Sequence, residues 1–189
     1  MGQKGKMYNP YMLGKQIYFR HPVEQDVKGK WHEWFSDEEI TKYMTDRFWP
    51  NSKEAQLIFY KSLFKNKDKL VLSIVNKSND EHIGIISLSS INWVHSYADI
   101  ALVLGEKEYR KGSIAVEAFS MMLKVAFIRL NLKNVKSAYN TLNKESEALH
   151  RLMKFNKVGV YKKLACIDGN DVDVIVEMLD RRSWIKRNT

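Results

Sequence analysis

The chain has 189 residues, of which 44% are hydrophobic, and its formal net charge is +9. Such a chain suits a single globular domain, which we place at residues 1–189 with its core at about 14–180. It has no run of about eighteen apolar residues to span a membrane and no apolar secretory segment at its start, so we expect a cytoplasmic protein without a membrane partner. Cys166 is the single cysteine of the sequence, so we expect no intrachain disulfide.

Hydrophobic spacing predicts the elements in chain order. After an irregular lead-in to residue 14 come a strand at 16–20 and helices that begin after Pro22, at Asp37 and after Ser52. Strands follow at 69–76, 82–91 and 97–104, then a largely buried helix at 113–130, a strand at 134–139 and a helix at 144–154. Two strands at 158–167 and 172–179 end the series. This order predicts an α/β (α+β) fold with one mixed, mostly antiparallel seven-stranded sheet and helices on both faces.

A net charge of +9 raises the alternative of a nucleic-acid-binding protein. The lysines are spread along the whole chain, however, and the compact basic run is confined to residues 181–187. The sequence has no helix-turn-helix, zinc-finger or RNA-recognition pattern. We therefore expect the positive charge to attract a small anionic ligand rather than nucleic acid.

A polar turn stands between the strand at 99–104 and the long helix that follows it. A helix start directs unpaired backbone N–H groups and a positive dipole end toward one point, which suits a phosphate group. Glycine in such a turn permits close approach of the backbone, and serine adds a hydroxyl donor. The predicted phosphate-binding residues are Arg110, Lys111, Gly112, Ser113, Ile114 and Ala115. The alternative is an ordinary helix start capped by Ser113.

The strand at 99–104, this turn and the helix after Asn143 together resemble the acetyl-coenzyme A (acetyl-CoA) half of the GNAT family of N-acetyltransferases. The resemblance covers about residues 14–180, and it departs from the family at Ser113 and Lys154, where relatives have glycine. It implies that acetyl-CoA is the co-substrate and that the strand separates from its neighbour. The pantetheine arm would then lie along Val103 and Leu104, with Asn143 and Ser146 beside the cofactor.

The same resemblance suggests groups for proton transfer. His150 occupies the position of a tyrosine that protonates the departing thiolate in many relatives, and histidine can do this work. Asp99, or alternatively His95 through a water, would accept the proton of the amine. The alternatives are a surface Asp99 paired with a lysine, a His95 that makes a loop hydrogen bond, and a His150 without a catalytic role. Asn92, Trp93 and Trp34 are expected to contact the acceptor, although the aromatic residues at 31–35 also suit a core.

The predicted function is direct acetyl transfer to a primary amine within a ternary complex, without a metal. The branch it resembles most acts on nucleotide-linked 4-amino sugars of bacterial surface glycans. Polyamines and protein N-termini are the alternative acceptors, and a polycation would favour an acidic site. Two further alternatives are a non-catalytic CoA-binding module and an acyl-carrying Cys166, which we expect in the core instead. The protein is expected to be a monomer or a homodimer.

Overall fold

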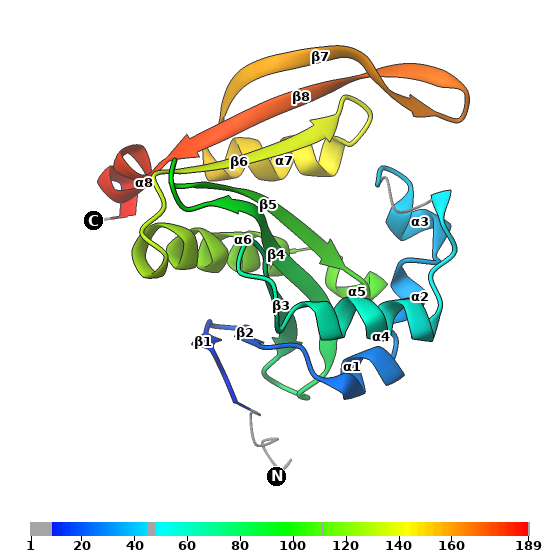
Figure 1. The fold of residues 1–189 in the computed structure, drawn as a ribbon. Coiled ribbons are helices and arrows are strands. Elements are labelled where there is room, and N and C mark those ends of the chain that lie inside the picture. The colour runs from blue at the N-terminus through cyan, green and yellow to red at the C-terminus, as the bar shows by residue number, and fades with distance from the viewer. Residues whose placement is uncertain (1–8, 45–47, 111, 189) are drawn as a thin grey trace.

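The computed structural model describes residues 9–44, 48–110 and 112–188. Its strands form one sheet in the order β1-β2-β3-β4-β5-β6-β8-β7, and β5 with β6 is the parallel pair among otherwise antiparallel neighbours (Figure 1). The strands are β1 (Met12–Leu13), β2 (Ile17–Arg20), β3 (Leu70–Asn76), β4 (His82–Asn92), β5 (Tyr97–Leu104), β6 (Asn134–Asn140), β7 (Asn156–Ile167) and β8 (Asn170–Asp180). The predicted fold class and the mixed sheet are confirmed.

Helices cover both faces of the sheet. They are α1 (Glu24–Lys28), α2 (Trp31–Trp34), α3 (Glu38–Thr41), α4 (Lys53–Ser62), α5 (Lys107–Arg110), α6 (Ile114–Lys124), the π-helical turn η2 (Val125–Arg129), α7 (Lys144–Met153) and α8 (Arg181–Asn188). The expected caps are present, because Asp37 accepts hydrogen bonds from the first turn of α3 and Ser52 accepts one from the Ala55 amide.

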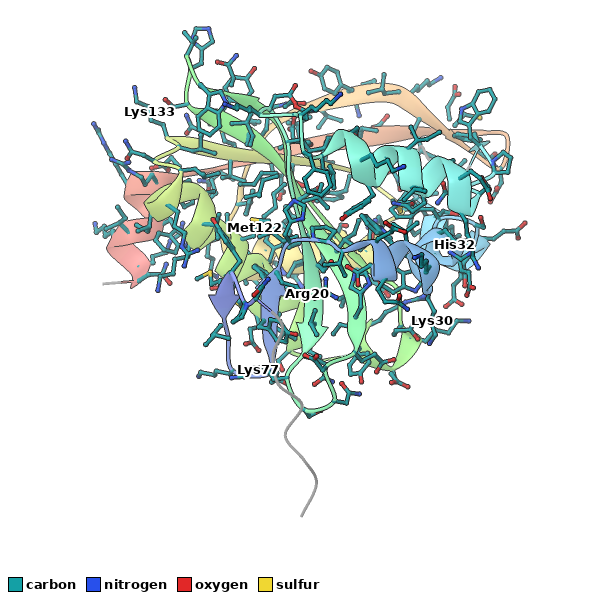
Figure 2. All side chains as sticks on the ribbon, turned by 60° about the horizontal axis from the view of Figure 1, so that its bottom comes forward. Arg20, Lys30, His32, Lys77, Met122 and Lys133 are labelled. Carbon is teal, nitrogen blue, oxygen red and sulfur yellow. The ribbon has the colours of Figure 1, made fainter. Side chains whose placement is uncertain are left out.

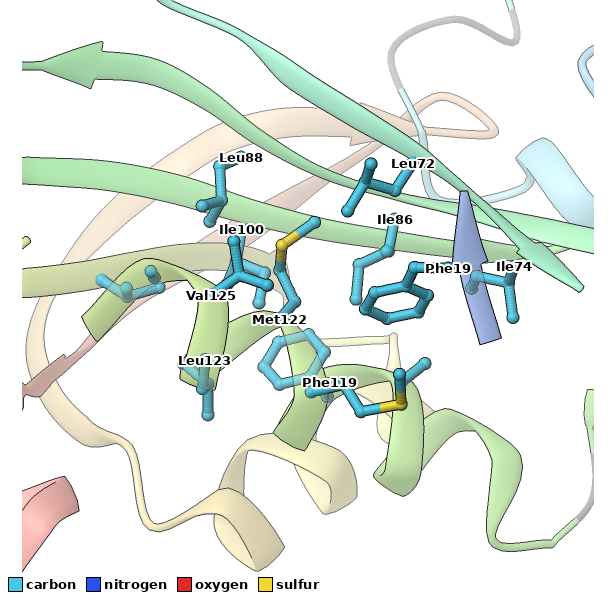
Figure 3. Close-up of a cluster of buried hydrophobic side chains, with 14 of the residues drawn as sticks. Phe19, Leu72, Ile74, Ile86, Leu88, Ile100, Phe119, Met122, Leu123 and Val125 are labelled. Atoms are coloured by element: carbon cyan, nitrogen blue, oxygen red, sulfur yellow. The ribbon is translucent and has the colours of Figure 1, made fainter. Parts of the chain in front are cut away.

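Alternate strand residues serve two separate hydrophobic clusters. Leu72 of β3 and Ile86 of β4 pack with Phe119 and Met122 of α6, as Figure 3 shows. Their chain neighbours Val71 and Ile85 point the other way and pack with Trp31 and Trp34 of α2. The period of two therefore places α6 on one face and the α1–α4 helices on the other.

A buried ion pair joins β2 to α1. Arg20 binds both carboxylate oxygens of Asp26 at 2.6 and 2.7 Å, and Ser73 donates to the same carboxylate. His82 lies against it, with 3.4 Å between its Nδ1 and Asp26 Oδ1. Arg20 is accordingly buried, whereas Lys30 and Lys133 are exposed; Figure 2 labels all three.

The structure differs from the predicted elements in four places. The lead-in contributes β1, because the Tyr11 amide bonds to the Phe19 carbonyl, so the sheet has eight strands rather than seven. Gly29 divides the helix after Pro22 into α1 and α2, and the short helix α5 precedes the long one. The basic run forms α8, which Trp184 anchors against Phe127 with 5.5 Å between ring centroids. None of the helices in the described ranges is long and apolar enough to cross a membrane.

Candidate functional site

β5 and β6 are paired along only part of their length. Their register runs from Tyr97 opposite Asn134 to Asp99 opposite Lys136 and then stops. Beyond that point β5 continues along β4 to Leu104, while β6 continues along β8 to Asn140. The edge of β5 at residues 100–104 therefore faces a gap between the two strands, which the sequence analysis predicted.

The direction of the β5 peptide groups follows from two hydrogen bonds. Ser137 Oγ donates to the Ile100 carbonyl at 3.3 Å, and Arg110 Nε donates to the Leu104 carbonyl at 3.1 Å. Both carbonyls thus point away from β4. Because the peptide groups of a strand alternate in direction, those of Leu102 also face the gap and those of Val103 face β4. The geometry therefore favours Leu102 over Val103 as the cofactor contact. The alternation of strand residues already indicates this in the sequence, because Leu102 is two residues from Leu104.

The polar turn ends in a glycine and an uncapped helix start. Gly112 has a φ of +121°, and a Cβ added to it would meet no atom within 4 Å. The first helical hydrogen bond runs from the Glu117 amide to the Ser113 carbonyl at 2.8 Å. The amides of Ile114 and Ala115 hence have no acceptor within α6. Lys111 lies outside the described residues.

Arg110 supports the end of β5 and is not turned outward over the helix start. Its guanidinium donates to the Leu104 carbonyl and to the Gly105 carbonyl at 3.0 Å. It also lies 3.4 Å from a carboxylate oxygen of Glu39 on α3, and Lys107 pairs with the same carboxylate. The segment at α3 is therefore linked directly to the turn.

Trp34 belongs to the core, which corrects its expected role at the acceptor. Its side chain is buried, and a Cβ on Gly105 would lie 2.0 Å from its ring. Its Nε1 donates to Glu106 at 3.0 Å, and Lys30 pairs with the other oxygen of that carboxylate. Only glycine lets the indole approach the end of β5 this closely, so Trp34 positions the turn from behind.

His150 is enclosed between α7 and the sheet. Its ring stacks on Tyr139, with 5.0 Å between centroids, and meets Phe119 and Phe155 edge-on. Its Nδ1 lies 2.6 Å from the Ser146 carbonyl, so Nδ1 carries the proton and the lone pair of the neutral ring is on Nε2. Burial lowers the pKa of His150. A neutral imidazole whose only N–H is already bonded does not suit the expected general acid.

The residues at the start of α7 make local contacts. The side chain of Asn143 caps the helix by accepting a hydrogen bond from the Ser146 amide at 3.0 Å. Lys154 ends the helix in the left-handed region with a φ of +61°, which explains why relatives have glycine there. Figure 1 shows that α6 and α7 lie on the same face and begin on the side where β5 and β6 separate.

Asp99 lies at the last paired position before the gap. Its carboxylate is partly exposed and forms an ion pair with Lys136 at 2.7 Å. Asp99 is therefore paired with a lysine, as one alternative expected. It also lies where the gap begins, which is the position that a base for the amine would need.

The loop with Asn92, Trp93 and His95 makes local contacts of its own at the start of β5. Asn92 accepts from the His95 amide at 2.8 Å, and the indole of Trp93 donates to the Lys67 carbonyl at 3.0 Å. The loop precedes β5, whose eight residues span about 23 Å before the polar turn. The sequence pattern predicted the order of the strands correctly, but it did not indicate at which end β5 separates from β6.

Cys166 is exposed on the edge strand β7, so the expectation that it belongs to the core is wrong. Among the described residues, His, Cys, Asp and Glu side chains do not gather in groups of three that could hold a metal ion.

A gap beside a half-paired parallel strand, closed by a turn and a helix start, is the geometry expected from the resemblance above. The profile of the acetyltransferase (GNAT) domain matches residues 16–156. The chain belongs to the GNAT family. It is therefore an N-acetyltransferase with acetyl-CoA as co-substrate.

Solved structures agree in fold. A spermidine N-acetyltransferase from Vibrio cholerae in complex with CoA and spermine is 18% identical, with a TM-score of 0.83 over 90% of this chain and 98% of that one. A chimeric form of the Vibrio cholerae enzyme is 18% identical, with a TM-score of 0.81 over 92% of this chain and 100% of that one. A probable acetyltransferase is 19% identical, with a TM-score of 0.77 over 90% of this chain and 96% of that one. No curated protein sequence matches the chain.

Proposed function

We propose that acetyl-CoA binds in the gap beyond Asp99 and that this protein transfers the acetyl group to a small primary amine. The observation that carries the proposal is that β5 leaves β6 after Asp99, so that the Leu102 N–H and carbonyl face the gap, whereas the Ile100 and Leu104 carbonyls already accept from Ser137 and Arg110. The pyrophosphate would bind the free amides of Ile114 and Ala115, and Gly112 leaves room for it. Once bound, acetyl-CoA supplies an activated thioester.

The residues of the chain orient that thioester and handle the proton of the amine. The Leu102 N–H, fixed toward the gap, would donate to the thioester carbonyl and stabilise the charge that develops there. Asp99 at the apex would accept a proton from the attacking amine, directly or through water. No acyl-carrying cysteine is required, because Cys166 stands on the distant edge strand.

A polyamine is the acceptor that the local charge favours. Residues 33–39 contain four carboxylates and no lysine or arginine, although the whole chain carries +9. This acidic segment is joined to the cofactor turn through Glu39 and Arg110. The solved relative from Vibrio cholerae was crystallised with spermine. The comparisons therefore favour the polyamine alternative over the amino sugar that the sequence first suggested.

A nucleotide-linked amino sugar is the second candidate, because the net charge of +9 favours an acceptor that carries phosphates. A panel of spermidine, spermine, a UDP-linked 4-amino sugar and N-terminal peptides distinguishes the candidates when CoA release and product mass are both measured. Turnover of the polyamines alone supports the first candidate, and turnover of the sugar alone supports the second. Tight acetyl-CoA binding without turnover of any acceptor would favour a non-catalytic module.

The role of Asp99 is tested in the same assay. Asp99→Asn should lower kcat at least tenfold and leave the Kd for acetyl-CoA unchanged. Asp171→Asn, which changes an exposed carboxylate near the β7–β8 turn, is the matched control. Unchanged kcat in the Asp99 variant would remove this residue from the mechanism without affecting the proposed cofactor site.

A further inference from the structure

The turn between β1 and β2 lies directly against the first turns of α6. A Cβ added to Gly14 would lie 2.2 Å from Glu117 Oε1 and 2.6 Å from Met121 Sδ, so the two segments are in contact. Lys77, which Figure 2 labels, donates from Nζ to the Gly14 carbonyl at 2.9 Å and brings a cation to the turn. The β1–β2 turn is therefore a direct neighbour of the helix start.

The carboxylate of Glu117 is directed at this turn by three N–H donors. The backbone amides of Lys15 and Gln16 both donate to Oε1, the second of them at 3.1 Å. The side chain of Gln16 donates to Oε2 through its Nε2, also at 3.1 Å. Hydrogen bonds to a carboxylate are stronger than those between neutral groups, so these three fix the carboxylate at the turn.

The carboxylate also decides which way round the amide of Gln16 lies. An ionised carboxylate can only accept hydrogen bonds, so the amide must turn its NH₂ group, and not its oxygen, toward Glu117. The same Nε2 donates to Ser113 Oγ at 2.6 Å. The Ser113 hydroxyl is therefore the acceptor in this contact, and it does not cap α6. Its own hydrogen is left without an acceptor among the described residues.

We propose that Gln16 is a positioning residue for the pyrophosphate of acetyl-CoA. The inference rests on the proposed function, which places that pyrophosphate at the free amides of Ile114 and Ala115. Ser113 is exposed beside these amides, so a ligand can reach its hydroxyl. Because Gln16 donates to the hydroxyl oxygen, the hydroxyl hydrogen is free to donate to a phosphate oxygen, whose negative charge makes it a strong acceptor.

Loss of Gln16 would give the hydroxyl hydrogen a competing acceptor. Glu117 follows Ser113 by four residues, so the two side chains are neighbours on one face of α6. Without Gln16 between them, the hydroxyl would donate to the carboxylate. The phosphate would then lose one donor, and Glu117 would lose the N–H group that now occupies its Oε2. Gln16 therefore keeps the hydroxyl available to the phosphate.

A double-mutant cycle on the full chain, measured by calorimetric titration with acetyl-CoA, tests the proposal. Ser113→Ala removes the donor altogether and should raise the Kd about five- to tenfold. Gln16→Ala should raise the Kd about three- to tenfold. The double variant should bind as Ser113→Ala does, within about twofold, because Gln16 acts through the hydroxyl. A glutamine that only held the turn in place would instead add its own loss to that of Ser113→Ala.

Two controls separate the phosphate contact from other effects. S-acetylpantetheine carries the thioester but no phosphate, and it should bind the wild type and both single variants equally. Gln25→Ala, an exposed change on α1, should leave the Kd for acetyl-CoA unaltered. An unchanged Kd in Gln16→Ala, or additive losses in the double variant, would overturn the role of Gln16, while acetyl-CoA binding by the wild type would still support the proposed function. A wild type that does not bind acetyl-CoA would contradict the proposed function and this inference with it.

Discussion

Replacing Ser113 with glutamate tests whether the start of α6 holds the pyrophosphate. Ser113 is exposed at this helix start, and its hydroxyl accepts a hydrogen bond from Gln16 Nε2 at 2.6 Å. A glutamate there would place a carboxylate beside the free amides of Ile114 and Ala115. It would therefore compete with the phosphates and repel them.

The size of the effect follows from Coulomb's law. A carboxylate about 5 Å from two phosphate charges, at an effective dielectric constant of about 40–80, opposes binding by about 1.5–3 kcal/mol. This corresponds to a roughly 10- to 150-fold higher Kd for acetyl-CoA. In the free protein, the negative charge gains about 0.3–1 kcal/mol from the helix N-terminus, and repulsion from Glu117 one turn later opposes this gain by a similar amount. The substitution thus weakens binding while leaving the free energy of unfolding within about 1 kcal/mol of the wild type.

Calorimetric titration with acetyl-CoA and thermal unfolding of the free protein measure these two quantities. Ser113→Gln, similar in size but neutral, is the matched control and should bind acetyl-CoA within about threefold of the wild type. The loss in the glutamate variant should shrink as salt is raised from about 0.1 to 1 M, because screening shortens from about 10 to 3 Å. An unchanged Kd in Ser113→Glu would show that the phosphates bind elsewhere.

Three further predictions concern stability. Burial lowers the pKa of His82 to about 4, so the folded protein, which holds this side chain neutral, should lose about 3 kcal/mol of stability as the pH falls from 6.5 to about 4. The stability of His82→Phe should decline less steeply with falling pH in acid unfolding, and equal slopes would contradict this. Gly105→Ala should lower the Tm by about 2–10 °C through its clash with Trp34, whereas Gly159→Ala, with open space at its Cβ, should not; equal Tm values would refute the packing argument. Lys154→Gly should raise the free energy of unfolding in urea by about 0.5–1 kcal/mol, because glycine adopts positive φ without strain, and a decrease would contradict that reasoning.

Most of the fold could be predicted from the sequence because its signals are local. The period-two strands, the caps Asp37 and Ser52, and the order of elements all depend on neighbouring residues. The two-residue strand β1 and the helix α8 could not, because each is held by a distant contact, such as Trp184 on Phe127.

The site was predictable only in part for the same reason. The strand, turn and helix start leave a contiguous pattern, so the location of the proposed phosphate-binding turn could be predicted without tertiary information. The burial of His150 and the packing of Trp34 on Gly105 depend on which faces meet in space. The role of the loop at His95 stays a prediction, because a single sequence does not say where β5 separates from β6.

Residue-resolved hydrogen exchange along β5 tests the central claim most directly. In the free protein, the amide of Val103 should exchange slowly because it is bonded to β4, and the amide of Leu102 should exchange faster. Addition of acetyl-CoA should slow the exchange of Leu102 strongly and leave Val103 nearly unchanged. Protection that appears outside residues 100–104 and the helix start, or an unchanged Leu102 at saturating acetyl-CoA, would contradict binding in the gap between β5 and β6.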